Sequence, residues 1–169
     1  MSTFESWDQY HMTMVYACAM KSKDASTQVG AVIVGAANNM VSMGFNGLPR
    51  GLKETPERSQ RPLKYLVTEH AERNSIYNAA RVGAKLEDCI MYTQICPCAE
   101  CARGIIQVGI KEIVVSKYWD QILDLQPQWA ESLKVAREMI DEVGIKFRTF
   151  DGTIKSVIEN VCSGQEIKF

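Results

Sequence analysis

This sequence has almost no excess charge, because 19 Lys and Arg residues stand against 20 Asp and Glu residues. Proteins that bind nucleic acid or anionic membranes through bulk electrostatics carry a clear basic excess. Residues 1–10 have neither a basic region nor an apolar run, and no stretch approaches the length of a membrane span. We therefore expect a small-molecule partner, no nucleic-acid or membrane partner, no secretory signal and a cytoplasmic location.

The chain also lacks internal repeats and low-complexity segments, and its 169 residues, 46% of them hydrophobic, suit one globular domain. We expect this domain to cover residues 1–150. Residues 151–169 form a tail in which Ile154, Val157, Ile158 and Val161 recur at helical spacing. That spacing predicts a short terminal helix packed on the domain or on another subunit.

A disulfide framework is not indicated, although the chain has six cysteines. Only Cys98 and Cys101 form a C-x-x-C pair, and in an intracellular setting such a pair favours metal binding. Cys96 precedes Pro97, the residue that we expect to open a helix, and we interpret it as a neighbour of the site rather than a ligand. The other three lie in apolar surroundings and suit small buried hydrophobes: Cys18, Cys89 and Cys162.

One His and two Cys form the chemical centre of the sequence: His70, in His70-Ala71-Glu72, and the pair Cys98 and Cys101. Three ligands are one fewer than a closed structural zinc site needs, and they match a catalytic site that leaves the fourth position to water. Glu72 lies two residues after His70, where it can act as a general acid and base without binding the metal. This H-x-E and P-C-x-x-C combination is the signature of zinc-dependent nucleobase deaminases.

The alternative is a zinc ion that only holds two helices together. That interpretation needs a fourth ligand, and the sequence offers only His11, on a separate predicted helix, and the awkwardly placed Cys96. We interpret His11 as a surface or packing residue. The open catalytic site is therefore favoured over a structural one.

The hydrophobic pattern predicts a three-layer α/β/α domain with a mixed five-stranded sheet. Ser6-Trp7-Asp8-Gln9 has the form of a capping box that opens a first helix. Pro97 occupies a position typical of the first residue of a helix. The expected strands cover residues 29–34, 40–44, 89–93, 111–116 and 145–150, and the later helices cover residues 70–82, 97–108 and 126–143.

Two connecting segments have compositions that suit ligand binding. Residues 44–51 hold three Gly and one Pro, which favours a shaped loop that a ligand can approach closely. Residues 50–66 hold five basic and two acidic residues, a net charge of +3, on an otherwise balanced chain. A long loop of this kind is typical of a lid or binding element, and its charge suits phosphate.

In the order and spacing of its motifs the chain resembles the deoxycytidylate (dCMP) deaminases. The resemblance rests on Ser22-Lys23-Asp24, Gln28 to Ala31, Gly44 to Pro49, His70-Ala71-Glu72 and Pro97 to Cys101. It covers most of residues 21–118, with a weaker continuation to Phe150. It implies a cytidine deaminase-like fold and hydrolysis of dCMP to dUMP and ammonia, which supplies dUMP for dTMP synthesis.

The resemblance also implies roles for individual residues. His70, Cys98 and Cys101 become the zinc ligands and Glu72 the proton carrier. Asn46 is implied as a sugar contact, and Tyr118 with the Ser22 to Thr27 loop as a 5′-phosphate contact. The residues that we therefore expect to bind substrate are Ser22, Lys23, Ser26, Thr27, Asn46, Ala71 and Tyr118.

Regulation and assembly are implied in the same way. The family resembled here forms hexamers that dCTP activates and dTTP inhibits, with Mg²⁺ bound to the triphosphate. Phe45, Asn46, Gly47 and Arg50 are thus implied as effector contacts, although Phe45 stands where a Tyr is common. Residues 50–66 lack the extra Cys and His that hold a second zinc in some members, so we expect one zinc ion per chain.

A second hypothesis is a deaminase that acts on RNA, similar to the tRNA adenosine deaminases, which carry much the same zinc motif. An enzyme of that kind needs a basic surface for its polyanionic substrate. The balanced charge of this chain favours the nucleotide over the RNA.

Overall fold

The computed structural model describes residues 4–119, 127–155, 159–162 and 165–168 of the chain. Its centre is a five-stranded mixed sheet in the order β2-β1-β3-β4-β5. β1 pairs antiparallel with both β2 and β3, whereas β3, β4 and β5 run parallel. The five strands are β1 (Gly30–Val34), β2 (Met40–Phe45), β3 (Ile90–Thr93), β4 (Glu112–Ser116) and β5 (Lys146–Phe150).

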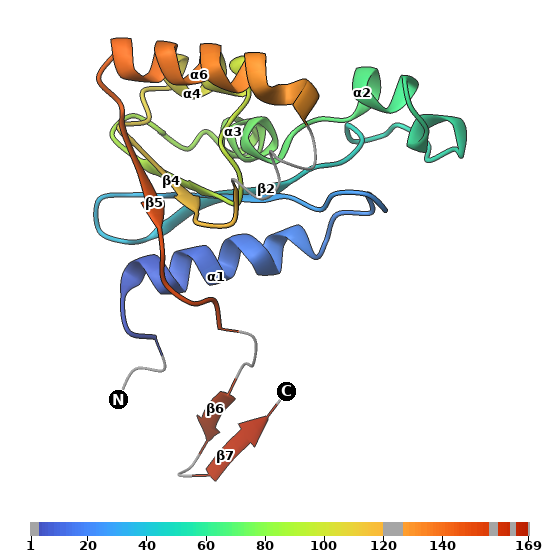
Figure 1. Ribbon diagram of the computed structural model, residues 1–169. Helices are drawn as coiled ribbons and strands as arrows, with labels where there is room; N and C mark the ends of the chain where they lie inside the picture. The colour runs from blue at the N-terminus through green and yellow to red at the C-terminus, as the bar shows by residue number, and fades with distance from the viewer. Residues whose placement is uncertain (1–3, 120–126, 156–158, 163–164, 169) are drawn as a thin grey trace.

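Helices cover both faces of this sheet, as Figure 1 shows. α1 (Trp7–Ala19) lies on one face, and α3 (Ala71–Val82), α4 (Ala99–Gln107) and α6 (Ala130–Glu142) lie on the other. The short helix α2 (Leu63–Val67) follows a 3-10 turn at Glu57–Ser59 and extends beyond the sheet. A second 3-10 turn, Pro127–Trp129, leads into α6. The predicted three-layer α/β/α architecture with a mixed five-stranded sheet is confirmed.

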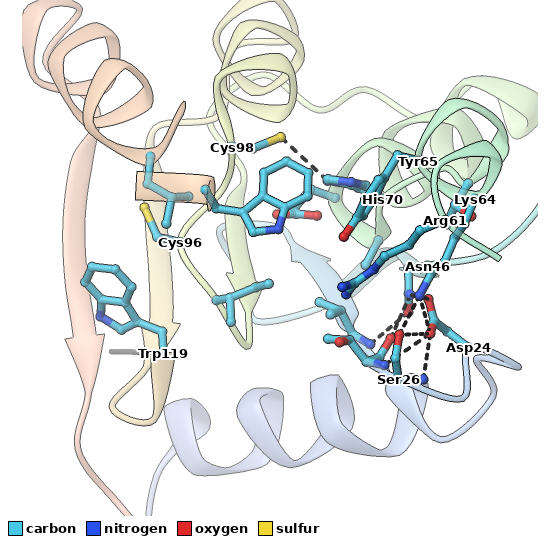
Figure 2. Close-up of a pocket in the computed structure, with 18 residues that line it drawn as sticks. Asp24, Ser26, Asn46, Arg61, Lys64, Tyr65, His70, Cys96, Cys98 and Trp119 are labelled. Carbon is cyan, nitrogen blue, oxygen red and sulfur yellow. Dashed lines mark hydrogen bonds and ion pairs between the residues drawn. The ribbon is translucent and has the colours of Figure 1, made fainter. Parts of the chain in front are cut away.

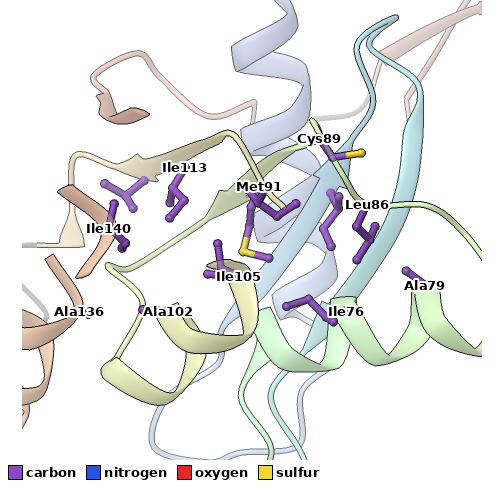
Figure 3. Close-up of a cluster of buried hydrophobic side chains, with 13 residues drawn as sticks. Ile76, Ala79, Leu86, Cys89, Met91, Ala102, Ile105, Ile113, Ala136 and Ile140 are labelled. Carbon is purple, nitrogen blue, oxygen red and sulfur yellow. The ribbon is translucent and has the colours of Figure 1, made fainter. Parts of the chain in front are cut away.

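Two apolar cores hold the layers together. The larger core joins α3, α4 and α6 to the sheet through side chains such as Ile76, Ile105, Ile113 and Ile140 (Figure 3). The smaller core joins α1 to the opposite face through Met12, Val15, Val32 and Val114, among others. β1 is buried along its whole length, which explains its continuous apolar sequence, because a strand covered on both faces has no solvent-facing side.

The start of α1 follows the predicted capping pattern with one difference. The Ser6 hydroxyl accepts a hydrogen bond from the Gln9 backbone N–H at 3.1 Å, as a capping box requires. The Gln9 side chain reaches back one residue further, and its Oε1 accepts from the Glu5 backbone N–H at 2.9 Å. His11 is fully buried and its ring stacks on Trp7, so the packing interpretation of His11 is confirmed.

Gly44 lets α3 pack closely onto β2. A Cβ atom at Gly44 would lie 2.3 Å from the Ser75 backbone nitrogen and 2.6 Å from the Ala71 carbonyl oxygen. This glycine is therefore required for contact between a strand and a helix. The close approach that we predicted for a ligand is made instead by α3.

Two local predictions are wrong. Pro97 is not the first residue of its helix, because Cys98 is the N-cap of α4 and Pro97 lies outside it. The terminal helix is replaced by an antiparallel pair, β6 (Glu159–Cys162) with β7 (Gln165–Lys168). Val161, one of the residues that carried the helical spacing, lies in β6, and its β-branched side chain prefers a strand. Val157 and Ile158 lie outside the described residues.

Within the part of the chain that the structure describes, no helix is long and apolar enough to cross a membrane.

Candidate active site

The N-termini of α3 and α4 meet beside the end of β3 and bring His70, Cys98 and Cys101 together. The His70 Nδ1 atom lies 3.5 Å from Cys98 Sγ and 3.6 Å from Cys101 Sγ. A tetrahedral zinc ion with Zn–S of about 2.3 Å and Zn–N of about 2.1 Å separates such ligands by about 3.6 Å. The three side chains therefore fit zinc. Among the described residues, no other group of three or more His, Cys, Asp or Glu side chains lies close enough together to hold a metal ion.

The local backbone leaves these side chains available to a metal. His70 and Cys98 are the N-caps of α3 and α4, in extended conformation, and neither side chain caps its own helix. The first N–H of α4, from Ala99, is bonded to the Ser132 hydroxyl of α6 at 3.1 Å instead. The positive end of the helix dipole favours the thiolate form that binds metal.

The two cysteines differ in their ionisation. Hydrogen bonding from Cys101, and after it from His70, lowers the pKa of the Cys98 thiol to about 4. The neighbouring Cys98 and burial raise the pKa of the Cys101 thiol. A thiol must lose its proton before it binds a metal. Metal binding at this site would therefore release protons and depend on pH.

Glu72 lies in the first turn of α3, two residues after His70, and only 3% of its surface is exposed. Burial raises the pKa of its carboxyl group, which the nearby His70 partly opposes. A carboxyl group in a protected site with a raised pKa is suited to accepting and returning a proton near neutral pH.

A pocket opens over this cluster (Figure 2). One wall comes from the segment after α1, a second from the basic segment around α2, and a third from the residues between β3 and α6. The residues that line it are Asp24, Ser26, Thr27, Val29, Asn46, Arg61, Lys64, Tyr65, Thr68, His70, Ala71, Glu72, Ile95, Cys96, Cys98, Trp119, Trp129 and Leu133.

A polar network holds one wall in place. The Lys64 ammonium group lies 2.7 Å from the Asp24 carboxylate and donates to the Ser26 hydroxyl at 2.6 Å. Asp24 also accepts from the backbone N–H groups of Ser26 and Thr27. The Asn46 side chain donates to the Thr27 carbonyl at 2.9 Å and accepts from the Val29 N–H at 2.8 Å. Asn46 and Asp24 therefore fix the loop that forms this wall.

Arg61 differs from Lys64 because it has no acidic partner among the described residues. Its guanidinium group lies over the Tyr65 ring, 5.3 Å from the ring centre. In Figure 2, Arg61 extends between His70 and the Asp24–Ser26 loop. Among the described residues of the pocket, Lys64 is therefore paired with a carboxylate and Arg61 is not.

Aromatic rings form another wall next to the metal ligands. The Trp129 ring lies edge-to-face with His70 at 5.8 Å and with Tyr65 at 5.9 Å between centres. Edge-to-face rings at this spacing are mutually stabilising, and all three rings line the pocket.

The family model for the cytidine and deoxycytidylate deaminase zinc-binding region matches residues 5–117. The chain belongs to this deaminase family. It is similar to the deoxycytidylate deaminase of Mus musculus, with 36% identity over 160 residues that cover 90% of this chain and 84% of the mouse protein. It is also similar to an uncharacterized deaminase of Aliivibrio fischeri, with 38% identity over 140 residues that cover 83% and 90% of the two chains.

The fold of this deaminase matches that of a solved dCMP deaminase from cyanophage S-TIM5. The TM-score is 0.67, and the match covers 88% of this chain and all of the phage chain at 19% sequence identity. The cytidine deaminase-like architecture predicted from the sequence is therefore confirmed.

Four of the seven residues predicted to bind substrate line the pocket of this deaminase: Ser26, Thr27, Asn46 and Ala71. The other three do not. The Ser22 hydroxyl is buried and donates to the Asn46 carbonyl at 2.8 Å, and Lys23 pairs with Glu54 on the surface. Tyr118 is 39% exposed and lies outside the pocket, whereas its neighbour Trp119 lines it.

The predicted effector residues do not form one cluster. Asn46 lies in the pocket, whereas Gly47 pairs with Glu69 by two backbone hydrogen bonds. Arg50 donates to the Asn78 side chain at 2.6 Å, on an exposed part of α3. Phe45 ends β2, and its carbonyl accepts from the Asn74 side chain at 2.7 Å.

Sequence reasoning missed several residues that line the pocket. The basic composition of residues 50–66 pointed to a binding element, but it did not single out Arg61, Lys64 or Tyr65. No local pattern indicated Trp119 or Trp129, because tertiary packing alone brings them to the ligands. Cys96 is buried in the pocket wall and stands outside the metal cluster, as expected.

Proposed function

We propose that this deaminase hydrolyses dCMP to dUMP and ammonia with one zinc ion per chain, and so supplies dUMP for dTMP synthesis. The observation that carries the proposal is the buried Glu72 carboxyl group, two residues after His70, in a site where His70, Cys98 and Cys101 could hold a metal ion. Three such ligands would leave the fourth position of a zinc ion to water. His70, Cys98 and Cys101 would hold the zinc ion. When bound, zinc supplies Lewis acidity that makes water a nucleophile at neutral pH.

The chain's own residues would move the protons. Glu72 takes a proton from the water that attacks C4 of the cytosine ring and delivers it to the ring nitrogen N3. It then takes the proton of the hydroxyl group now on C4 and passes it to the amino group, so the C4–N bond breaks, ammonia leaves and the C4 carbonyl of uracil forms. One carboxyl group with a raised pKa suffices, because it accepts and returns protons in turn.

The rest of the pocket would recognise a nucleoside monophosphate. The aromatic wall of Tyr65 and Trp129 suits the flat base. Arg61 suits the 5′-phosphate, since its guanidinium group has no acidic partner within the described chain and can bind two phosphate oxygens at once. A sugar contact from Asn46 remains a prediction, because its side chain already binds the 24–29 loop.

The relatives support this choice of substrate. Curated proteins from Mus musculus and Homo sapiens, each 36% identical to this chain over most of its length, are named deoxycytidylate deaminases. The structure of the cyanophage S-TIM5 protein was solved in complex with dCMP and dUMP.

The test is to incubate the purified protein separately with dCMP, CMP, deoxycytidine and unmodified tRNA, and to measure ammonia and the deaminated product. We expect dUMP from dCMP and no inosine in the tRNA. Release of ammonia from tRNA alone would favour the RNA deaminase and contradict the proposal.

We also propose that the chain forms a hexamer that dCTP activates and dTTP inhibits, with Mg²⁺ on the triphosphate. The proposal comes from the resemblance to dCMP deaminases. One structural feature is compatible with it: residues 45–50 run from the pocket, at Asn46, to the outer side of α3, at Arg50. Rate curves against dCMP should become sigmoidal with dTTP and hyperbolic with dCTP. Curves that neither nucleotide changes would contradict regulation.

A further inference from the structure

Arg73 connects the two segments that carry the metal ligands. It lies on α3, one turn after His70. Its Nε donates to the Glu69 carboxylate, immediately before His70, and its Nη1 donates to the Glu100 carboxylate, between Cys98 and Cys101. One guanidinium group therefore reaches the neighbours of all three ligands.

The Glu69 end of this connection is itself anchored. The Glu69 Oε1 atom that binds Arg73 also accepts from the His70 backbone N–H at 3.2 Å. The Glu69 backbone pairs with Gly47 through hydrogen bonds of 3.0 and 2.8 Å. Arg73 thus connects a segment fixed to the end of β2 with the first turn of α4.

The pair with Glu69 is partly shielded from water, since the Arg73 and Glu69 side chains are 18% and 19% exposed. Glu100 is more open, at 61%. An ion pair with a partner as exposed as Glu100 contributes little to global stability. A metal site is more sensitive, because its ligands must be held within about 0.5 Å of the productive geometry.

We propose that Arg73 is a positioning residue, which holds His70 at the correct distance from Cys98 and Cys101 through Glu69 and Glu100. The inference rests on the proposed zinc site and adds that the strength of zinc binding depends on a residue that is not a ligand.

The experiment compares Arg73→Met, Arg73→Lys and Arg81→Met with the wild-type protein. Arg81 lies on the same helix, and its exposed side chain serves as the matched control. The zinc dissociation constant is measured by competition with a chromophoric chelator, and the visible spectrum is recorded after replacement of zinc by Co²⁺. Loss of groups that support metal ligands typically weakens binding by about 10–100-fold.

We expect weakening of this size and an altered Co²⁺ spectrum for Arg73→Met, a smaller effect for Arg73→Lys, and no effect for Arg81→Met. Wild-type affinity and spectrum in Arg73→Met would overturn the inference. If Arg73→Met does not fold, Glu100→Gln is the second variant, because it removes the exposed carboxylate that pairs with Arg73. Unchanged zinc affinity in Glu100→Gln would also overturn the inference. A wild-type protein that binds no zinc would instead refute the proposed function.

Discussion

Two pocket carboxylates show how surroundings give the same functional group different roles. Glu72 is buried without a cationic partner in hydrogen-bond range among the described residues, so burial raises the pKa of its carboxyl group. Burial acts in the same direction on Asp24, but the Lys64 ion pair and the Ser26 and Thr27 N–H groups outweigh it, and the pKa of Asp24 is lowered. Glu72 is therefore suited to carry protons, and Asp24 stays charged and holds a loop.

The two pocket cations lead to a prediction about substrate choice. Arg61→Gln should lower kcat/KM for dCMP by about 10–100-fold, because a hydrogen bond to a charged group contributes about 1.5–3 kcal/mol. The value for deoxycytidine, which has no phosphate, should stay unchanged. Steady-state kinetics with both substrates measures the difference.

Arg58→Gln is the control for this prediction. Arg58 lies in the same basic segment but outside the pocket, where it donates to the Lys53 carbonyl at 2.6 Å. An equal loss of kcat/KM for dCMP and deoxycytidine in Arg61→Gln would show that Arg61 does not bind the phosphate.

At the scale of elements, the site depends on how closely α3 and α4 approach the sheet. The N-cap residues of the two helices, His70 and Cys98, belong to the candidate metal site, and α3 also packs against β2 at Gly44. The periodicity of the sequence predicted these helices and strands well, because each is amphipathic or apolar over its whole length. The helix predicted for the tail is wrong at residues 159–162, because the spacing of its Ile and Val residues indicated a helix although β-branched residues prefer strands.

The contact between α3 and β2 gives a prediction about stability. Gly44→Ala should reduce the free energy of unfolding by about 1–3 kcal/mol, because the new Cβ would overlap the α3 backbone and force a shift. Chemical denaturation monitored by circular dichroism measures the change.

Gly104→Ala is the matched control within α4. Its new Cβ would lie 3.6 Å from the Ile76 side chain, an ordinary contact, and Ala is preferred to Gly inside a helix by about 0.5–1 kcal/mol. A Gly44→Ala protein as stable as Gly104→Ala would show that the close packing is not needed.

At the scale of the whole molecule, the fold brings side chains from distant parts of the chain, between Asp24 and Leu133, to the lining of one pocket. The cluster of His70, Cys98 and Cys101, with Glu72 in the same helix turn as His70, could be predicted from sequence. His70 and Glu72 lie within three residues, Cys98 and Cys101 lie within four, and both pairs lie at a helix start. Trp119, Trp129 and Arg61 could not be predicted, because no spacing relates them to the ligands and only the folded chain brings them there. The sequence therefore predicts the reaction better than the substrate.

The central claim is that Glu72 carries protons at a zinc site that it does not help to form. The most direct test is the rate of dUMP formation per bound zinc ion in the wild type, in Glu72→Gln and in the surface control Glu87→Gln. We predict about one zinc ion per chain in all three proteins, and a rate at least about 10²-fold lower in Glu72→Gln alone. A Glu72→Gln protein with the wild-type rate, or with a rate reduced only in proportion to lost zinc, would contradict the account.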